Sequence, residues 1–117
     1  MPAAIDRNQH LNLLNVRQEL AISQERMSTL LKVSTKTITR WEKGERLPSN
    51  IDALSRLAKL KEITELGQMV YTSIGFQEFL KTPLPVFEGR SGFNLLQLGD
   101  YETVISALAA DFEGTAF

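Results

Sequence analysis

Residues 23–44 read SQERMSTLLKVSTKTITRWEKG, and this stretch decides the fold of the first half of the chain. Ser23 and Ser34 can each cap a helix, because a serine hydroxyl accepts a hydrogen bond from the free amides of a first turn. Apolar residues recur at helical spacing after each serine: Met27, Leu30 and Leu31, then Ile38 and Trp41. The pattern predicts two short helices joined by a tight turn.

The second of these helices has two sides of different chemistry. When Ile38 faces the core, the opposite side of the helix is basic, with Thr39 beside it. At ~100° per residue, Lys36, Arg40 and Lys43 lie within roughly 40° of that opposite pole. A helix of this kind, braced by a shorter one, is what a helix-turn-helix inserts into the DNA major groove. The alternative is an ordinary solvated surface, because most exposed helices carry charges opposite their core side.

Further residues in and around the two helices add to this pattern. They are Arg17, Ser23-Gln24-Glu25, Val33-Ser34, the run from Ile38 to Gly44, and Arg46, Pro48 and Ser49. With them, residues 12–60 resemble the Xre/Cro-type helix-turn-helix domain of phage repressors and bacterial regulators. The resemblance implies an all-α chain that begins with a five-helix, lambda-repressor-like DNA-binding domain over residues 8–62.

The resemblance also implies which side chains contact DNA. Base edges would be read by the exposed side of the second helix: Thr35, Lys36, Thr39 and Arg40. Arginine or lysine suits guanine O6 and N7, and a threonine methyl suits the thymine methyl. Gln24, at the start of the first helix of the pair, and Lys43 and Arg46 are expected at phosphates.

Two other positions bear on the geometry of the motif. The family commonly pairs an arginine of its first helix with the glutamate after the tryptophan, which implies an Arg17–Glu42 ion pair. A half-buried pair costs desolvation, so we expect it to fix helix geometry more than to add stability. Lys32 stands where the family often has a left-handed glycine, so the turn should cost roughly 1 kcal/mol or adopt a slightly different shape.

The composition bounds the class of protein. A chain of 117 residues with 43% hydrophobic content forms one ordinary domain or two small ones that share a core. The chain has no cysteine, which excludes disulfides and thiolate catalysis. No apolar run approaches the ~20 residues that span a bilayer. We therefore expect a soluble, cytoplasmic, nucleoid-associated protein without a membrane partner.

The charge is divided unevenly along the chain. Residues 1–62 carry 11 Lys and Arg against 7 Asp and Glu, whereas residues 63–117 carry 2 against 7. DNA phosphates should attract the first part and repel the second. The two parts are therefore expected to have different partners.

Periodicity predicts helices outside the central pair as well. The first should cover residues 9–20, with Leu13, Val16 and Leu20 on one face. A helix from Ile51 should bury Ile51, Leu54, Leu57 and Ala58, and a separate one should span residues 61–71. That last helix either continues with a bend to Leu80 or breaks near Ser73.

The remaining third reads as a loop and two short helices. Residues 81–90 contain two prolines and a glycine and predict an ordered loop. Ser91 and Asp100 should cap helices that end at Gly99 and Gly114. The last helix presents apolar residues at helical spacing: Val104, Ile105, Leu108 and Phe112. Helices this short must pack on a neighbouring helix, another subunit or a partner.

A second pattern covers residues 76–117. It consists of Phe79-Leu80, Thr82-Pro83, Pro85, Gly89-Arg90-Ser91, Phe93, Leu95-Leu96, Gly99, Val104 and Gly114. These residues resemble the C-terminal toxin-binding domain of Xre/MbcA/ParS antitoxins. The resemblance implies that residues 63–117 form a helical dimerisation or toxin-binding domain whose partner is a toxin, often of the NAD-consuming RES type.

The candidate partner contacts in this region are Arg90 and Phe117. Arg90 would either meet a partner or brace its own loop, and the C-terminal tail would either enter a toxin or fray. The chain departs from the family pattern at Leu84, Glu88 and Gly92, where asparagine, glycine and proline are common. Core packing is the preferred role of the apolar residues: Phe79, Phe93, Leu95, Leu96 and Val104.

Two functional hypotheses remain. The first is a sequence-specific DNA-binding transcriptional regulator, a homodimeric repressor on a two-fold double-stranded operator, which also serves as the antitoxin of a toxin–antitoxin pair. The alternative is a stand-alone transcription factor whose C-terminal domain only dimerises or binds another protein. Nothing in the sequence supports an enzyme, a metal site or a cofactor, since its one histidine is isolated and no phosphate-loop pattern is present.

Overall fold

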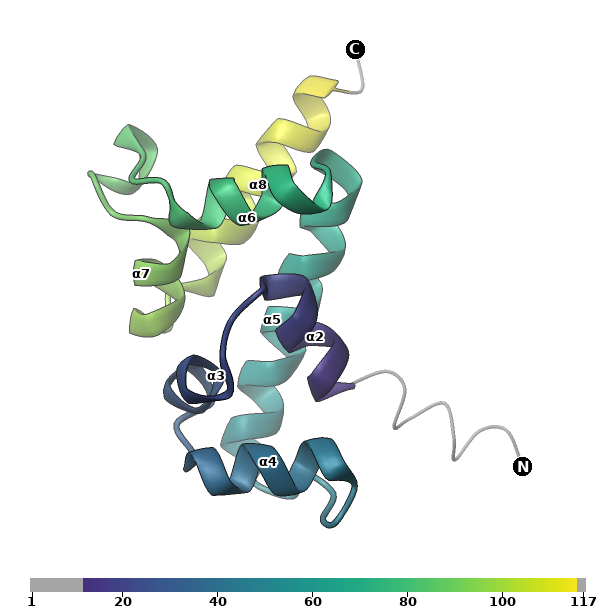
Figure 1. Cartoon of the computed structure of the whole chain (residues 1–117). Helices are drawn as coiled ribbons and strands as arrows, with labels where there is room; N and C mark the ends of the chain where they lie inside the picture. The colour runs from purple at the N-terminus through teal and green to yellow at the C-terminus, as the bar shows by residue number, and fades with distance from the viewer. Residues whose placement is uncertain (1–11, 116–117) are drawn as a thin grey trace. The chain divides into compact units, whose positions relative to one another are not determined.

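The computed structural model describes residues 12–115, and every regular element in this range is helical (Figure 1). In chain order the elements are α2 (Leu13–Leu20), α3 (Gln24–Leu31), α4 (Thr35–Lys43), α5 (Ile51–Val70), α6 (Ser73–Lys81), the 3-10 helix η1 (Pro85–Phe87), α7 (Gly92–Leu98) and α8 (Tyr101–Thr115). The predicted all-α class is confirmed. The chain divides into two compact units, Met1–Lys61 and Glu62–Phe117.

Short polar side chains cap the helices of the first unit. The side chains of Asn12, Ser23 and Ser34 accept hydrogen bonds from amides three residues on, at 2.9, 3.0 and 3.0 Å. The helix expected over residues 9–20 is present from Leu13, and Asn12, whose own backbone is extended, acts as its cap. The expected residues 9–11 lie outside the described part of the chain.

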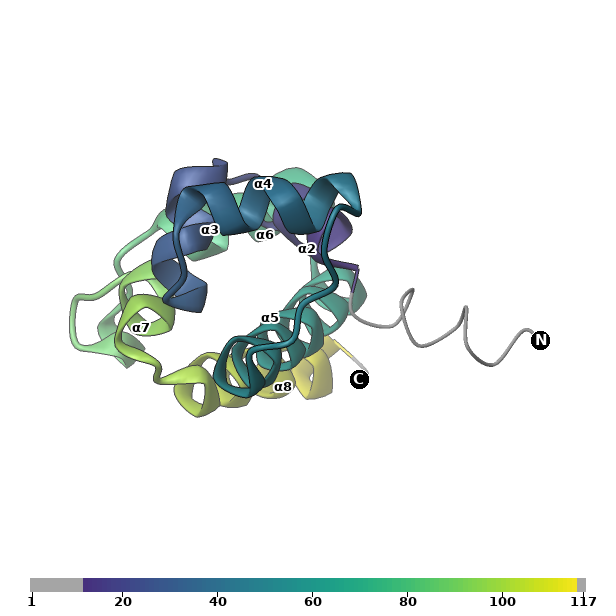
Figure 2. The ribbon, with the colours of Figure 1, turned by 90° about the horizontal axis from the view of Figure 1, so that it is seen from below.

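In the described part of the first unit, the predicted apolar faces of α2, α3 and α4 are buried. Fully or nearly fully buried residues from these helices are Leu13, Val16, Leu20, Met27, Leu30, Leu31 and Ile38. The helix α4 packs against α3, as Figure 2 shows, and also contacts α2. Helices this short have little stability alone, so burial of this face holds them in place.

Two predictions about the segment that forms α5 are wrong. The separate helices expected from Ile51 and over residues 61–71 are one continuous helix, Ile51–Val70. Its buried stripe runs through Ala53, Leu57, Leu60, Ile63, Thr64 and Gly67. The predicted face of Ile51, Leu54 and Ala58 is wrong, since Ile51 is 83% exposed. Small residues hold buried positions on this helix, and a prediction based on large apolar residues does not identify them.

The turn between α3 and α4 keeps the expected left-handed residue without glycine. Lys32 has φ 62° and donates its backbone N–H to the Ser28 carbonyl. The Val33 amide donates to the same carbonyl at 3.1 Å. The turn therefore adopts the common left-handed helix ending and accepts the steric cost of a Cβ there, about 1 kcal/mol.

The second unit begins within α5 and turns at Tyr71. Of the two alternatives for this segment, the break near Ser73 is confirmed, because Thr72 caps α6 by accepting from the Gly75 amide at 3.0 Å. The Phe76 ring lies directly on the backbone of Gly67. A Cβ at Gly67 would lie 2.3 Å from the Phe76 ring, so this contact requires a residue without a side chain.

The proline-containing loop is ordered, as expected. The amides of Phe87 and Gly89 both donate to the Leu84 carbonyl, at 3.0 and 2.9 Å, and the Leu84 amide donates to the Arg90 carbonyl at 3.1 Å. The Phe87 side chain is buried. Glu88 adopts φ 57°, which explains why glycine suits this position in the family pattern.

The last two helices start where the sequence predicts. The side chains of Ser91 and Asn94 form a reciprocal capping box for α7, and Gly99 ends it in the left-handed conformation. The Asp100 carboxylate accepts from the Thr103 amide at 3.3 Å. Gly114 does not end α8, which runs to Thr115. Val104 and Leu108 are buried, but Phe112 is 43% exposed and does not belong to the core.

Candidate nucleic-acid interface

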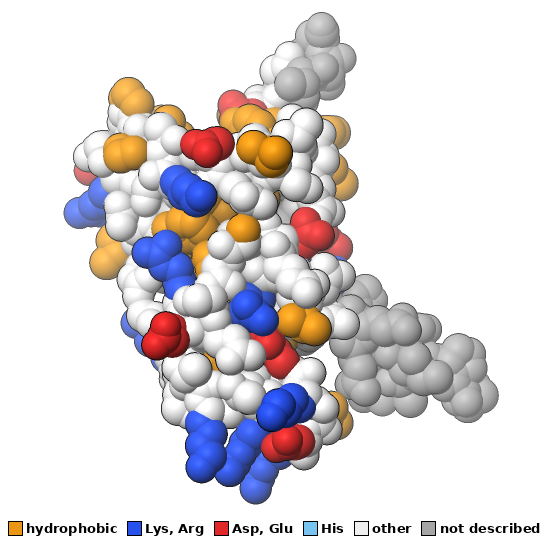
Figure 3. Space-filling view, viewed as in Figure 1, with side chains coloured by type: hydrophobic (Ala, Val, Ile, Leu, Met, Phe, Trp, Pro, Cys, Tyr) orange, Lys and Arg blue, Asp and Glu red, His pale blue; other side chains and the backbone are white. Residues whose placement is uncertain are grey.

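Four cations are exposed on and just after α4. Lys36, Arg40, Lys43 and Arg46 are all solvent-exposed. Within residues 12–115, no hydrogen bond or ion pair joins these four side chains to another group of the protein. Figure 3 shows Lys and Arg side chains gathered at the lower edge of the view, over α4. Their charges are therefore available to an anionic partner.

The two threonines of α4 already use their hydroxyl groups within the protein. The Thr39 hydroxyl lies 3.0 Å from Gln24 Oε1 and 3.1 Å from the Thr35 carbonyl, and donates toward these acceptors. The Thr35 hydroxyl donates to Ser28 Oγ at 3.3 Å. Each hydroxyl has only one proton, so both threonines can offer DNA their methyl groups and oxygen lone pairs but no further donor.

Gln24 connects α3 with α4. Its Nε2 donates to Glu42 Oε1 at 2.8 Å, and its Oε1 accepts from Thr39. Ser23 caps the helix that Gln24 opens. The side chain predicted at a DNA phosphate thus has two protein partners, which hold it in one orientation and leave one amide N–H for another acceptor.

Arg17 and Glu42, the pair implied by the family resemblance, lie in direct contact. Arg17 Nε donates to Glu42 Oε2 at 2.5 Å and its Nη2 donates to Oε1 at 3.0 Å, so the contact is bidentate. The third donor, Nη1, reaches the Ile22 carbonyl at 3.0 Å. This single guanidinium therefore joins α2 to α4 and to the segment that precedes α3.

The ion pair shifts the pKa of both Arg17 and Glu42. The hydrogen bond with Glu42 raises the pKa of Arg17, although burial opposes it. Burial by itself would raise the pKa of Glu42, but hydrogen bonds from Arg17 and Gln24 and the charge of Arg17 together lower it. Only 7% of the Glu42 side chain is exposed, so its charge depends on these partners.

These contacts form one hydrogen-bonded chain that we call the polar clamp: Arg17, Glu42, Gln24 and Thr39. The clamp links α2, α3 and α4 to one another. Sequence reasoning found the ion pair but missed the role of Gln24 and the occupied hydroxyl of Thr39. Helical periodicity contains no signal for such contacts, because they join residues 15 and 18 positions apart.

The structure describes only one of the two candidate partner residues of the second unit. The Arg90 side chain is exposed, and no hydrogen bond from its guanidinium to the described residues braces the loop, which is closed by backbone bonds. Phe117 lies outside the described residues. A role for Arg90 at a partner surface stays a prediction.

Residues 12–115 hold no group of three or more His, Cys, Asp and Glu side chains placed to bind a metal ion. In the same range no helix is both long and apolar enough to cross a membrane.

Comparison with known proteins agrees with this geometry. Residues 13–60 match the model of a helix-turn-helix family. The fold resembles a chain in the crystal structure of the M. tuberculosis MbcT–MbcA toxin–antitoxin complex, with a TM-score of 0.74 and 20% identity over 91% of this chain and 95% of that chain. No curated protein sequence matches the chain. Residues 13–60 are thus a helix-turn-helix domain.

Proposed function

We propose that the protein is a sequence-specific DNA-binding regulator that represses transcription and also acts as the antitoxin of a toxin–antitoxin pair. The observation that carries the first part is the set of exposed cations on α4, without protein partners among the described residues, within a region that matches a helix-turn-helix family. The proposal involves no catalysis and assigns the protein to the bacterial cytoplasm and its nucleoid.

In this proposal α4 enters the major groove and reads base edges. Lys36 and Arg40 donate to guanine O6 and N7, which is the commonest specific contact of these side chains. Thr39 contributes its methyl group to a thymine methyl, because its hydroxyl proton is directed at Gln24 and the Thr35 carbonyl. The polar clamp keeps α3 and α4 in the relative orientation that this docking requires.

Contacts to the sugar-phosphate backbone set the register. Lys43 and Arg46 lie at and beyond the end of α4 and approach phosphates. The remaining Gln24 N–H and the free amides at the start of α3 approach another phosphate. A homodimer would place two α4 helices about 34 Å apart on a two-fold operator.

The antitoxin role rests on residues 63–117. Their resemblance to the toxin-binding domain of Xre/MbcA/ParS antitoxins is supported by a fold similar to that of a chain in a toxin–antitoxin complex. The proposed partner is a toxin of the RES type. The competing function is a stand-alone transcription factor, in which the acidic second unit only dimerises or binds another protein.

The DNA-binding proposal is tested by in-vitro selection of an operator, followed by binding of Arg40→Ala. Loss of a bidentate base contact should weaken specific binding by about 1–3 kcal/mol and relax the preference at one base pair. Arg56→Ala is the control, because Arg56 pairs with Asp52 on α5 at 3.0 Å. Equal affinity and unchanged base preference for Arg40→Ala would overturn the recognition-helix assignment.

The antitoxin proposal is tested in cells. The gene adjacent to this one is expressed alone and together with the full chain. Toxicity that the full chain neutralises, and that Arg40→Ala also neutralises, would support an antitoxin whose interaction unit is separate from DNA reading. An adjacent gene without toxicity would favour the stand-alone transcription factor.

A further inference from the structure

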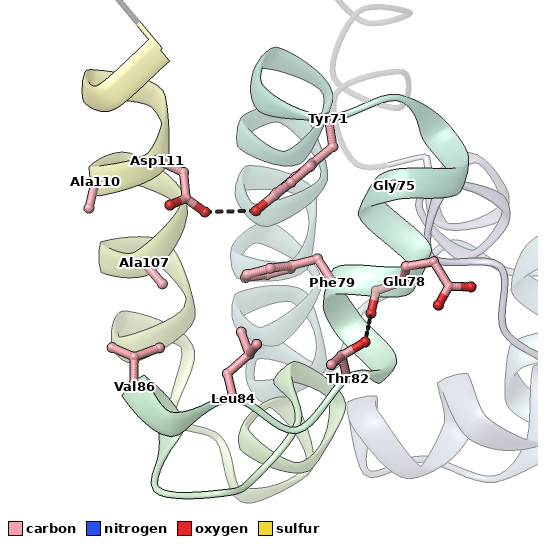
Figure 4. A pocket seen from close by; sticks show the side chains of 10 residues that line it. All are labelled: Tyr71, Gly75, Glu78, Phe79, Thr82, Leu84, Val86, Ala107, Ala110 and Asp111. Carbon is pink, nitrogen blue, oxygen red and sulfur yellow. Dashed lines mark hydrogen bonds between the residues drawn. The ribbon is translucent and has the colours of Figure 1, made fainter.

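The second unit contains an apolar hollow that the DNA-binding proposal does not use. It lies between α6, the loop around η1 and α8, with a volume of about 520 Å³ (Figure 4). Phe79, Leu84 and Val86 provide large apolar surface, while Ala107 and Ala110 form a low wall along α8. Small residues on one side of a hollow allow another backbone to approach closely.

The hollow is built on a fixed aromatic base. The ring of Phe79 stacks with that of Tyr71 at 5.4 Å between centroids and meets the edge of Phe87 at 6.0 Å. The Tyr71 hydroxyl donates to Asp111 at 2.7 Å across the hollow. These contacts hold the lining side chains in place, so an occupant would not have to order them.

The hollow continues along α8 into a second one of about 370 Å³. The two share Val86, Ala107 and Ala110, and we call them together the α8 groove. The groove is lined by α8 from Glu102 to Asp111. At 1.5 Å per residue this stretch is about 14 Å long, which is two to three turns of a helix.

The rim of the α8 groove is acidic. Glu78 and Asp111 line the first hollow and Glu102 lines the second. Residues 63–117 carry 7 Asp and Glu against 2 Lys and Arg, so the part of the chain that contains this rim has a net negative charge. A second copy of the same acidic unit would be repelled, whereas a cationic segment would be attracted.

We propose that the α8 groove binds an amphipathic, basic helix of a partner protein. Apolar anchors at i, i+3 or i+4 and i+7 fill the space above Ala107 and Ala110, which is how helices dock in apolar grooves. Lysine or arginine residues at the edges of that apolar face meet Asp111, Glu78 and Glu102. The inference rests on the interaction role proposed for residues 63–117 and specifies the surface and the chemistry of the partner.

A displayed library of helical peptides of about 16 residues, selected on the full chain, tests the proposal. Three variants are compared with the wild type. Asp111→Lys reverses the charge at the rim, and Ala110→Leu fills the groove from an exposed position. Glu113→Lys is the matched control, because it makes the same charge change two residues further along α8 at an exposed site that lines neither hollow. Thermal melting establishes that each variant is folded.

The selected peptides should be amphipathic and rich in lysine and arginine. Asp111→Lys and Ala110→Leu should each weaken peptide binding about tenfold or more, while Glu113→Lys should change it by about twofold or less. Added salt should weaken the binding of these peptides to the wild-type chain. Peptides without a basic bias, or equal losses for Asp111→Lys and Glu113→Lys, would overturn the proposal. A change of oligomeric state in Ala110→Leu would instead make a second copy the occupant.

Operator binding by the same variants separates this inference from the proposed function. Asp111→Lys and Ala110→Leu should bind DNA as the wild type does. Loss of peptide binding with intact operator binding assigns the effect to the groove. Neutralisation of a toxin by both variants would leave the antitoxin role standing and show that the toxin binds elsewhere than in the α8 groove.

Discussion

The two units add different contacts to their apolar cores. In the first unit, the polar clamp joins three helices through charged and amide side chains. In the second, aromatic rings contact one another and Phe76 lies on Gly67. A polar clamp depends on protonation and bond direction, whereas aromatic packing depends on volume. Changes of charge at the clamp should therefore act on the first unit, beside its apolar core, and a change of volume at the Gly67–Phe76 contact should act on the second.

The largest expected effect is that of Gly67→Ala. The new methyl group would lie 2.3 Å from the Phe76 ring, so the ring must move, and overpacking of this kind should destabilise the protein by about 2–3 kcal/mol. Denaturant unfolding gives the size of the loss, and hydrogen exchange of α6 amides locates it in the second unit. Gly114→Ala is the control, because a Cβ there meets nothing within 4 Å. Equal stability of Gly67→Ala and wild type would contradict the contact.

A smaller loss of stability is expected from Glu42→Gln, which breaks the polar clamp. Removing charge-assisted hydrogen bonds to Arg17 and Gln24 should cost about 2 kcal/mol at neutral pH. The folded-state pKa of Glu42 is lowered, so its contribution is present above the unfolded pKa and disappears as pH falls through the folded one.

The difference in unfolding free energy between wild type and Glu42→Gln should therefore shrink below about pH 4. Unfolding curves of both proteins from pH 7 to pH 3 measure it. A difference that stays constant across this range would mean that the carboxylate charge does not contribute to the clamp.

Two substitutions should stabilise the protein, one in each unit. Lys32 and Glu88 have φ of 62° and 57°, where a Cβ is strained. Lys32→Gly and Glu88→Gly should each add about 0.5–1 kcal/mol, after allowance for the greater freedom of glycine in the unfolded chain. Denaturation midpoints are the measurement, and a similar gain in both turns would show that backbone strain is independent of the packing mode around it. A loss in either variant would reveal a contact of the replaced side chain.

The last prediction concerns alkaline pH and the second unit. Burial and the hydrogen bond to Asp111 raise the pKa of Tyr71 to about 12. A raised pKa contributes stability below the unfolded value of about 10 that is lost as pH rises toward 12. Ultraviolet titration of tyrosinate, with Tyr71→Phe subtracted, should show the late step. A Tyr71 that titrates near pH 10 would place its hydroxyl in open solvent.

Local signals in the sequence were sufficient for the helix ends. Ser23, Ser34 and Ser91 cap helices, and Gly44 and Gly99 end them, because a cap involves residues only three or four positions apart. The break between α5 and α6 could also be predicted from local signals. The ion pair of Arg17 and Glu42 came from a family resemblance, since no local rule joins residues 25 positions apart.

Packing between distant residues could not be predicted in this way. The face of α5 was placed wrongly because Ala53 and Gly67 hold contact positions that larger residues would overfill. The length of α5 is underestimated because the apolar periodicity predicts two helices, one from Ile51 and one over residues 61–71, where the structure has the single helix Ile51–Val70. The α8 groove also has no sequence signal, because α6, η1 and α8 form it together.

The boundary between the two units falls at Lys61, inside the continuous helix α5. Recombination that joins the first unit to a different second unit therefore has no loop to exploit at this point. A cut there leaves four carbonyls without helical partners on one fragment and four amides on the other. A fragment of the first unit should accordingly extend to Val70 to fold well, and proteases should find little to cleave at the boundary between the two units.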